Sequence, residues 1–142
     1  MDIQMSAGDM HAFLAAEFPQ VASDFQVEEV GPTGMTVRLK VAERHLRPGG
    51  TVSGPSMFAL ADVAVYLAVM ARLGPVALAV TTNASLDFMR KPVAGRDLIA
   101  RAEILKLGRS LAVGDVRITS EGADDVVARA TMTYAIPPKT TK

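Results

Sequence analysis

The run from Met57 to Ala71 constrains the fold more than any other stretch, because it is apolar at nearly every position. A helix that is apolar all round offers no face to water, so the rest of the chain must surround it. The run is shorter than the ~20 residues needed to cross a bilayer, and charged residues flank it on both sides. We therefore expect a buried core helix and no membrane span.

The ends of this helix are marked by residues typical of helix boundaries. Ser53 or Gly54 can cap its N-terminus, and Pro55 suits the first turn, where no intrahelical hydrogen bond is lost. Gly74, which a proline follows, ends it. The sequence thus predicts one long helix over about residues 55–73, about 28 Å in length at ~1.5 Å per residue.

Asp62 is the residue of the apolar run that points most strongly to function. A carboxylate is costly to bury as an ion, so it must be paired, protonated or used in chemistry. The structural alternative is a helix carboxylate that the backbone or an arginine satisfies.

Composition limits the class of protein. A chain of 142 residues is most simply one domain, 1–142, with a core over about 10–136 and a solvated tail at 137–142. Apolar residues make up 49%, which is more than a small monomer readily hides, so we expect a homo-oligomer. Zero net charge argues against nucleic-acid binding, and without cysteine no thiolate metal site is expected. The N-terminus does not resemble a signal peptide, which predicts a cytoplasmic protein.

Outside the long helix the pattern is mostly that of strands. Apolar and polar residues alternate without a break from Met35 to Val41, as in a strand with one buried face. Apolar residues at helical spacing from Met10 to Phe18 predict a short N-terminal helix. The connections between the last three predicted strands are too short to contain crossover helices, so neighbouring strands must be antiparallel. We predict an α+β fold with a five- to six-stranded antiparallel sheet around the helix, its strands near 25–30, 35–41, 76–87, 98–104, 111–119 and 126–134.

Several short motifs occur in a suggestive order. The segment His45–Pro55, followed by Leu-Ala-Asp62, is similar to N-P-x-G-T-V-H-G-G…L-A-D. Leu86–Pro92 is similar to a strand that ends in F-x-x-P, and residues 108–110 to a G-R-[ST] turn. Together these motifs resemble the PaaI-like acyl-CoA thioesterases over roughly residues 10–136. The resemblance implies the hotdog fold and hydrolysis of a medium-chain or aromatic acyl-CoA, with coenzyme A present only as part of the substrate.

Thioester hydrolysis needs a donor that polarises the carbonyl and a group that attacks it or activates water. The backbone N–H of Gly54, at a helix N-terminus, is the candidate donor. Asp62 is the candidate general base or nucleophile, and the sequence does not separate these two routes. In the resembling enzymes the acid faces a hydroxyl from the partner subunit; this position falls on Thr82, with Thr81 and Asn83 as close alternatives.

The resemblance also implies contacts to the coenzyme A part of the substrate, made by cations and turn amides. The chain departs from the family motif at three positions: Arg47 replaces the Asn, Ser53 the His and Pro55 the second Gly. These departures leave open which acyl group the protein prefers and how efficiently it hydrolyses the thioester. The candidate substrate-binding residues are Arg47, Ser53, Arg90, Lys91, Lys106, Gly108, Arg109 and Ser110.

Two other functions remain open. A hotdog dehydratase or hydratase would use His45 with Asp62 on a 3-hydroxyacyl thioester. The spacing from Pro48-Gly49 to Asp62 is, however, longer than the pattern of that enzyme family allows. A non-catalytic acyl-CoA-binding protein is the other, because the family's Asn and His are missing. For assembly we expect a homodimer whose sheets join through 76–87, doubled into a homotetramer as a dimer of dimers.

Overall fold

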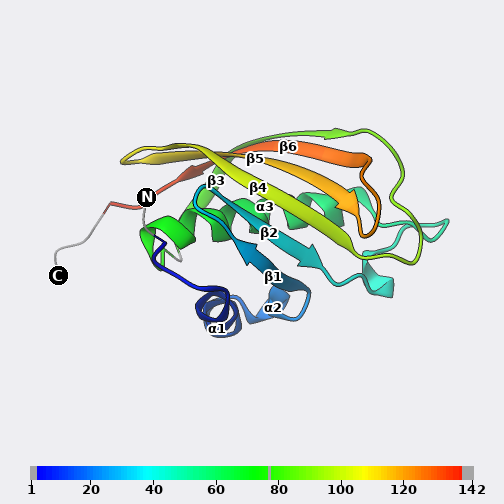
Figure 1. Ribbon diagram of the computed structural model, residues 1–142, viewed down its shortest axis with the longest axis horizontal. Helices are drawn as coiled ribbons and strands as arrows, with labels where there is room; N and C mark the ends of the chain where they lie inside the picture. The colour runs from blue at the N-terminus through cyan, green and yellow to red at the C-terminus, as the bar shows by residue number, and fades with distance from the viewer. Residues whose placement is uncertain (1–2, 77, 139–142) are drawn as a thin grey trace.

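The computed structural model describes residues 3–76 and 78–138, and within them the chain forms one antiparallel sheet and three α-helices (Figure 1). In chain order the elements are α1 (Ala7–Glu17), α2 (Pro19–Ala22), β1 (Phe25–Val30), β2 (Gly34–Leu39), a 3-10 turn (Glu43–His45), α3 (Gly54–Leu73), β3 (Val80–Phe88), β4 (Leu98–Leu107), β5 (Leu111–Ser120) and β6 (Val126–Ala135).

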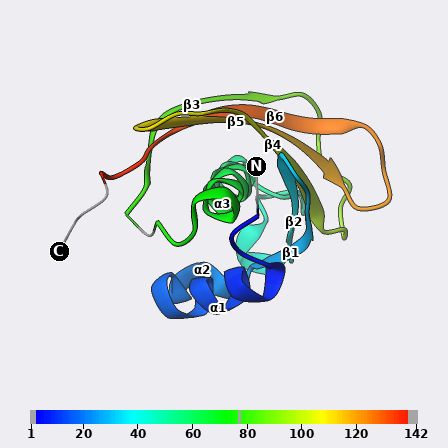
Figure 2. The same ribbon diagram turned by 60° about the vertical axis from the view of Figure 1, so that its left-hand side comes forward.

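The strands lie in the order β1-β2-β4-β5-β6-β3, and each neighbouring pair is antiparallel, as predicted. α3 carries the chain from β2 across the sheet to β3, which forms an edge and pairs with β6. Figure 2 shows the sheet curling over α3, while α1 and α2 lie below the helix. This is the α+β hotdog architecture that the resemblance implied.

The predicted central helix is confirmed, and it begins one residue earlier, at Gly54. Ser53 is its N-cap, with the side-chain oxygen accepting from the N–H of Ser56 at 3.3 Å. α3 contacts every strand of the sheet, which explains why most of its apolar side chains are buried, although Phe58 and Leu73 near its two ends remain exposed. By length and composition alone α3 could span a membrane, but 72% of its most apolar 18-residue stretch is buried inside the protein. Its fully buried members include Leu60, Ala64, Leu67 and Met70.

Gly114 on β5 lets α3 approach the sheet closely. A Cβ atom at this position would lie 2.9 Å from Cγ1 and 3.1 Å from Cγ2 of Val65 on α3. Carbon atoms in contact normally lie ~3.5–4.0 Å apart, so any side chain at 114 would push helix and strand apart. Val65 lies one helical turn beyond Asp62, and this contact therefore also sets how closely the acid approaches the sheet.

The N-terminal helix is confirmed, with bounds set by its caps. Ser6 and Asp9 form a capping box at the start of α1, with contacts of 2.9 and 3.1 Å. α1 ends at Glu17 with Phe18 as its C-cap, and Pro19 begins the short helix α2. The predicted strand over 76–87 begins too early, because Ala79 donates to the carbonyl of Val76 in a turn and pairing with β6 starts at residue 80.

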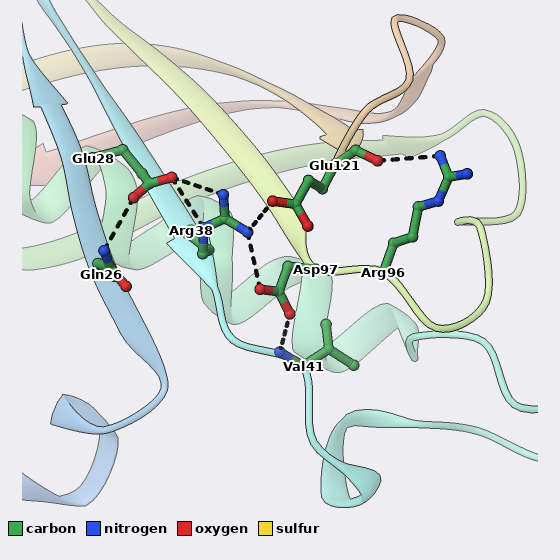
Figure 3. A network of polar contacts seen from close by, with 7 residues as sticks. All are labelled: Gln26, Glu28, Arg38, Val41, Arg96, Asp97 and Glu121. Atoms are coloured by element: carbon green, nitrogen blue, oxygen red, sulfur yellow. Dashed lines mark hydrogen bonds and ion pairs between the residues drawn. The ribbon is translucent and has the colours of Figure 1, made fainter.

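A cluster of charges joins β1 and β2 to the ends of β4 and β5 (Figure 3). The guanidinium of Arg38 forms ion pairs with Glu28 at 2.9 Å, Asp97 at 3.0 Å and Glu121 at 2.7 Å. Glu121, then Asp97 and Glu28, raise the pKa of Arg38 above its usual range. Asp97 also accepts from the N–H of Val41 at 2.9 Å. The cluster lies on strands far along the sheet from Asp62, so we assign it to the fold.

Candidate active site

Asp62 is half-buried on α3, whereas the residues on both sides of it are buried. It lines a cleft of about 370 Å³ between α3, the start of β3 and the junction of α1 with α2. The carboxylate therefore reaches an accessible space from within the apolar core helix. The other lining residues are Glu17, Phe18, Val63, Tyr66, Ala79, Val80, Thr81 and Tyr134.

Two hydroxyl groups hold one oxygen of this carboxylate. Thr81 Oγ1 donates to Oδ1 of Asp62 at 2.5 Å, and Tyr134 Oη lies 2.7 Å from the same Oδ1. Tyr134 Oη also lies 2.9 Å from the backbone carbonyl oxygen of Asp62. Within residues 3–76 and 78–138, no protein group donates to Oδ2. The two carboxylate oxygens thus have different surroundings.

No lysine or arginine in the described part of the chain forms an ion pair with Asp62. This rules out, for those residues, the structural alternative in which an arginine satisfies the helix carboxylate. Neutral hydroxyls satisfy one of its oxygens instead. Such a carboxylate can accept a proton or attack an electrophile without first breaking an ion pair.

Tyr134 is a candidate site residue that the sequence analysis did not identify. Its side chain is only 3% exposed, and its ring stacks on Tyr66 with centroids 5.9 Å apart. Burial, and then the charge of Asp62, raise the pKa of Tyr134 far above its usual range, so its hydroxyl stays protonated. The one sequence signal was that a tyrosine on the buried face of a strand needs a partner for its hydroxyl.

Gly54 is the first residue of α3, so its N–H has no acceptor within the helix. None of the described residues accepts from it either. It lines a second, apolar cleft of about 420 Å³ with Pro55, Phe58 and Phe88. Asp62 lies eight positions further along the helix, about 12 Å at ~1.5 Å per residue. Within one protomer, the two groups therefore cannot reach the same carbonyl.

The threonine hydroxyl beside Asp62 within the protomer is that of Thr81, which the sequence left as an alternative. Thr82 is exposed, and its hydroxyl donates to the carbonyl of Thr133 at 3.4 Å. The pairing of β3 with β6 shifts register between Thr81 and Asn83, and such a bulge breaks the alternation of faces. The role expected for Thr82, which requires a partner subunit, stays a prediction.

The predicted coenzyme-binding residues are exposed or half-buried, and they fall into separate groups. Arg90 and Lys91 follow β3 beside the Gly54 cleft, and Arg90 pairs with Asp125 at 3.5 Å. The turn of Gly108, Arg109 and Ser110, preceded by Lys106, joins β4 to β5 at the opposite end of the sheet, near Tyr134. The length of β3, roughly 26 Å, separates the two groups. Arg47 lies on the exposed loop before α3, which ends at the cap Ser53.

His45 lies apart from Asp62 and has structural contacts. Its Nδ1 accepts from the N–H of Ala42 at 2.8 Å, and its Nε2 lies 3.3 Å from Oδ2 of Asp24. The ring is buried, and it does not line the cleft that contains Asp62. These contacts do not favour the dehydratase pairing of His45 with Asp62. Among the described residues, no cluster of three or more histidine, aspartate or glutamate side chains is placed to hold a metal ion.

Comparison with known proteins gives consistent matches. The sequence matches the profile of the thioesterase superfamily over residues 49–127, a region that contains all of α3. It is 25% identical to acyl-coenzyme A thioesterase 13 of Mus musculus over 119 residues, 82% of this chain and 83% of that protein.

Two solved structures are similar along most of the chain. A protein of Silicibacter sp. TM1040, assigned as a thioesterase, is 59% identical, with a TM-score of 0.91 over 97% of this chain and 96% of that one. The phenylacetic acid degradation protein PaaI of Thermus thermophilus, solved as a point mutant, is 33% identical. It matches with a TM-score of 0.71 over 84% of this chain and 99% of that one. The resemblance that the sequence motifs predicted is confirmed.

Proposed function

Because the chain belongs to the thioesterase superfamily, we propose that it hydrolyses acyl-CoA thioesters and that Asp62 carries the chemistry. The observation that supports this most is a carboxylate on the core helix that lines a cleft, is held by two hydroxyls and pairs with no cation among the described residues. Such a group can act on a substrate without first breaking an ion pair. The similarity to an acyl-coenzyme A thioesterase supports acyl-CoA as the substrate class.

In the proposed reaction, Asp62 takes a proton from a water molecule as that water attacks the thioester carbonyl carbon. The carbon–sulfur bond then breaks, and the proton passes to the departing sulfur of coenzyme A. Direct attack by the carboxylate would instead form a mixed anhydride, which water hydrolyses in a second step. In both routes the N–H of Gly54 donates to the carbonyl oxygen, where negative charge develops.

We propose a medium-chain or aromatic acyl group, because the cleft beside Asp62 is mainly apolar. Phe18, Val63 and Val80 give it hydrophobic walls. Glu17 adds a second carboxylate to the lining, and its charge would oppose an acyl group that carries its own carboxylate.

We further propose that two copies of the chain complete each site. The ~12 Å between Gly54 and Asp62 prevents them from acting on the same carbonyl within one protomer. Two α3 helices related by a two-fold axis can instead place Gly54 of one protomer beside Asp62 of its partner. β3 supports this pairing, because its outer edge lacks a partner strand among the described residues and most of its side chains are exposed. A further pairing of dimers into a tetramer is part of the same proposal.

Purified protein, incubated with a panel of acyl-CoAs and a thiol reagent, tests the activity. We expect thiol release, and Asp62→Asn should lower kcat by ~10² or more, the scale of a lost general base. The amide is nearly isosteric and still accepts from both hydroxyls, so the melting temperature should change little. A change in enoyl absorbance without thiol release would indicate a dehydratase, and binding without turnover a non-catalytic protein; either would refute the proposal.

A heterodimer tests whether the site is shared. Gly54→Pro removes the N–H, and Ser53, with ψ 157°, already has the backbone conformation that precedes proline. Each homodimer, Asp62→Asn or Gly54→Pro, should be inactive. A heterodimer purified through two different tags should regain about half of the wild-type rate, because one of its two sites is intact. An inactive heterodimer would contradict the shared site, and a monomer by light scattering would contradict the assembly.

A further inference from the structure

We propose that Tyr134 is the positioning residue of the Asp62 carboxylate, fixing Oδ1 so that Oδ2 is the oxygen that acts on the water or the thioester. This inference rests on the proposed function and adds a residue that the sequence motifs do not contain. Tyr134 lies on β6, seventy-two positions along the chain from Asp62. Only the fold brings the two together.

The first argument is the geometry of the hydroxyl. Tyr134 Oη lies 2.7 Å from Oδ1 and 2.9 Å from the backbone carbonyl oxygen of the same residue, Asp62. One proton is shared between these two acceptors. A contact to both the side chain and the main chain fixes the orientation of the carboxylate relative to the helix axis. A hydrogen bond to the side chain alone would not do so.

The second argument is that the hydroxyl itself cannot move. The ring is almost completely buried and stacks on Tyr66, which in turn lies 6.2 Å from Phe13 on α1, measured between ring centroids. Aromatic rings from β6, α3 and α1 thus lie in a row, with Tyr134 stacked on Tyr66 and Phe13 tilted by 54° against Tyr66. The tyrosine donates from a rigid position, as a positioning residue must.

The third argument concerns which oxygen reacts. The two oxygens of a carboxylate are equivalent until their surroundings differ. Oδ1 of Asp62 already accepts from Thr81 at 2.5 Å and from Tyr134, which draws electron density and occupies its lone pairs. Oδ2 has no donor among the described residues, so it is the oxygen free to take a proton or attack a carbon. The arrangement therefore holds Oδ2 in one orientation, with a lone pair directed toward the substrate.

Tyr134→Phe tests the proposal, because it removes the hydroxyl and keeps the stacked ring. We expect kcat to fall by about 10- to 100-fold, the range for one hydrogen bond to a charged group, while KM changes less than about twofold. The reason is that the substrate is still bound but meets a carboxylate that rotates. An unchanged kcat, or a change confined to KM, would overturn the proposal. Thermal unfolding should show that the variant remains folded.

A second substitution separates positioning from direct contact with substrate. In protein that already carries Asp62→Asn, Tyr134→Phe should cause no further loss, because its only route to the reaction is gone. A full additional loss in the double variant would mean that Tyr134 acts on the substrate itself, and would refute the positioning role. The control is Thr119→Val, which removes a buried hydroxyl at the opposite end of β5 and should leave kcat unchanged.

The crystal structure of Tyr134→Phe gives a result that does not depend on turnover. We expect the Asp62 carboxylate to turn about its Cβ–Cγ bond, with Oδ1 kept only by Thr81. An unmoved carboxylate would refute the positioning role even if the wild-type protein cleaves every thioester in the panel. If the wild-type protein cleaves none and the carboxylate does turn, the proposed function fails and the structural role of Tyr134 stands.

Discussion

Replacing Gly114 with alanine should both destabilise the protein and weaken its activity. The added methyl group would lie 2.9 and 3.1 Å from the two γ-carbons of Val65. Relief of this overlap to ~3.5–4.0 Å requires a movement of about 0.6–1.1 Å. Val65 is fully buried and, as a β-branched residue in a helix, has one preferred rotamer, so it cannot turn aside. The helix and the sheet must separate instead.

The expected cost follows from this overlap. Overpacking of a buried contact typically costs about 1–3 kcal/mol. Alanine recovers roughly 0.5 kcal/mol by restricting the unfolded chain, so we expect a net loss of ~0.5–2.5 kcal/mol. For a chain of 142 residues this lowers the melting temperature by roughly 2–10 °C. Because Val65 and Asp62 share one face of α3, the same shift should lengthen the 2.7 Å contact between Tyr134 and Asp62 and lower kcat.

Calorimetry and thiol-release kinetics on Gly114→Ala, Val65→Ala, their double variant and a control test this reasoning. Val65→Ala removes the clash, so the double variant with Gly114→Ala should be more stable than the sum of the two single changes predicts. Gly8→Ala is the matched control: it lies in α1 with its nearest neighbour, Ser6 Oγ, 3.8 Å away, and should be neutral or slightly stabilising. A melting temperature for Gly114→Ala equal to that of the wild type, or strictly additive changes, would refute the close-contact explanation.

Two further predictions concern charge. Burial, and then the charge of Arg44, lower the pKa of His45 although Asp24 is close, because Arg44 already pairs with Asp24. As the pH falls below about 6.5, the unfolded chain binds a proton at His45 that the folded chain does not, so the free energy of unfolding should decrease by at most ~1.4 kcal/mol per pH unit. Urea unfolding at several pH values should show a smaller decrease for His45→Asn than for the wild type. The same pH dependence in both proteins would contradict this prediction. Arg109→Met should raise KM for acyl-CoA by about two- to fivefold with kcat unchanged. KM for a thioester truncated before the nucleotide should stay constant, and an equal rise for both substrates would contradict a phosphate contact.

Much of the fold could be predicted from local pattern. The apolar run bounded by Ser53 and Gly74 had to be a buried helix, and alternation located the strands to within a few residues. The pairing of β3 with β6, and with it the order of the strands, could not be predicted from this pattern. Strand order depends on contacts between residues far apart in sequence, and alternation gives no information about them.

The candidate site shows the same limit. Asp62 stands out in sequence because its charge conflicts with its neighbours, and Gly54 because it begins a helix. Tyr134 has no such conflict, since a tyrosine fits a buried strand and its hydroxyl reveals its role only when α3 lies against β6. That Thr81 contacts Asp62 within the protomer could not be predicted, because a bulge changes which residue faces the helix and leaves no mark on the pattern of residue types.

That Gly54 and Asp62 lie on a single helix limits how such a protein can diversify. A residue inserted between them would turn one by about 100° around the helix axis relative to the other, so their spacing along α3 must stay constant. The substrate range can then change only through substitutions that leave this spacing unaltered. The departures from the family motif fit this rule, since Arg47 and Ser53 precede the helix and Pro55 lies in its first turn, where it alters no spacing. New specificities are therefore best sought in the loop before α3 and at the far end of β3, with the helix left as it is.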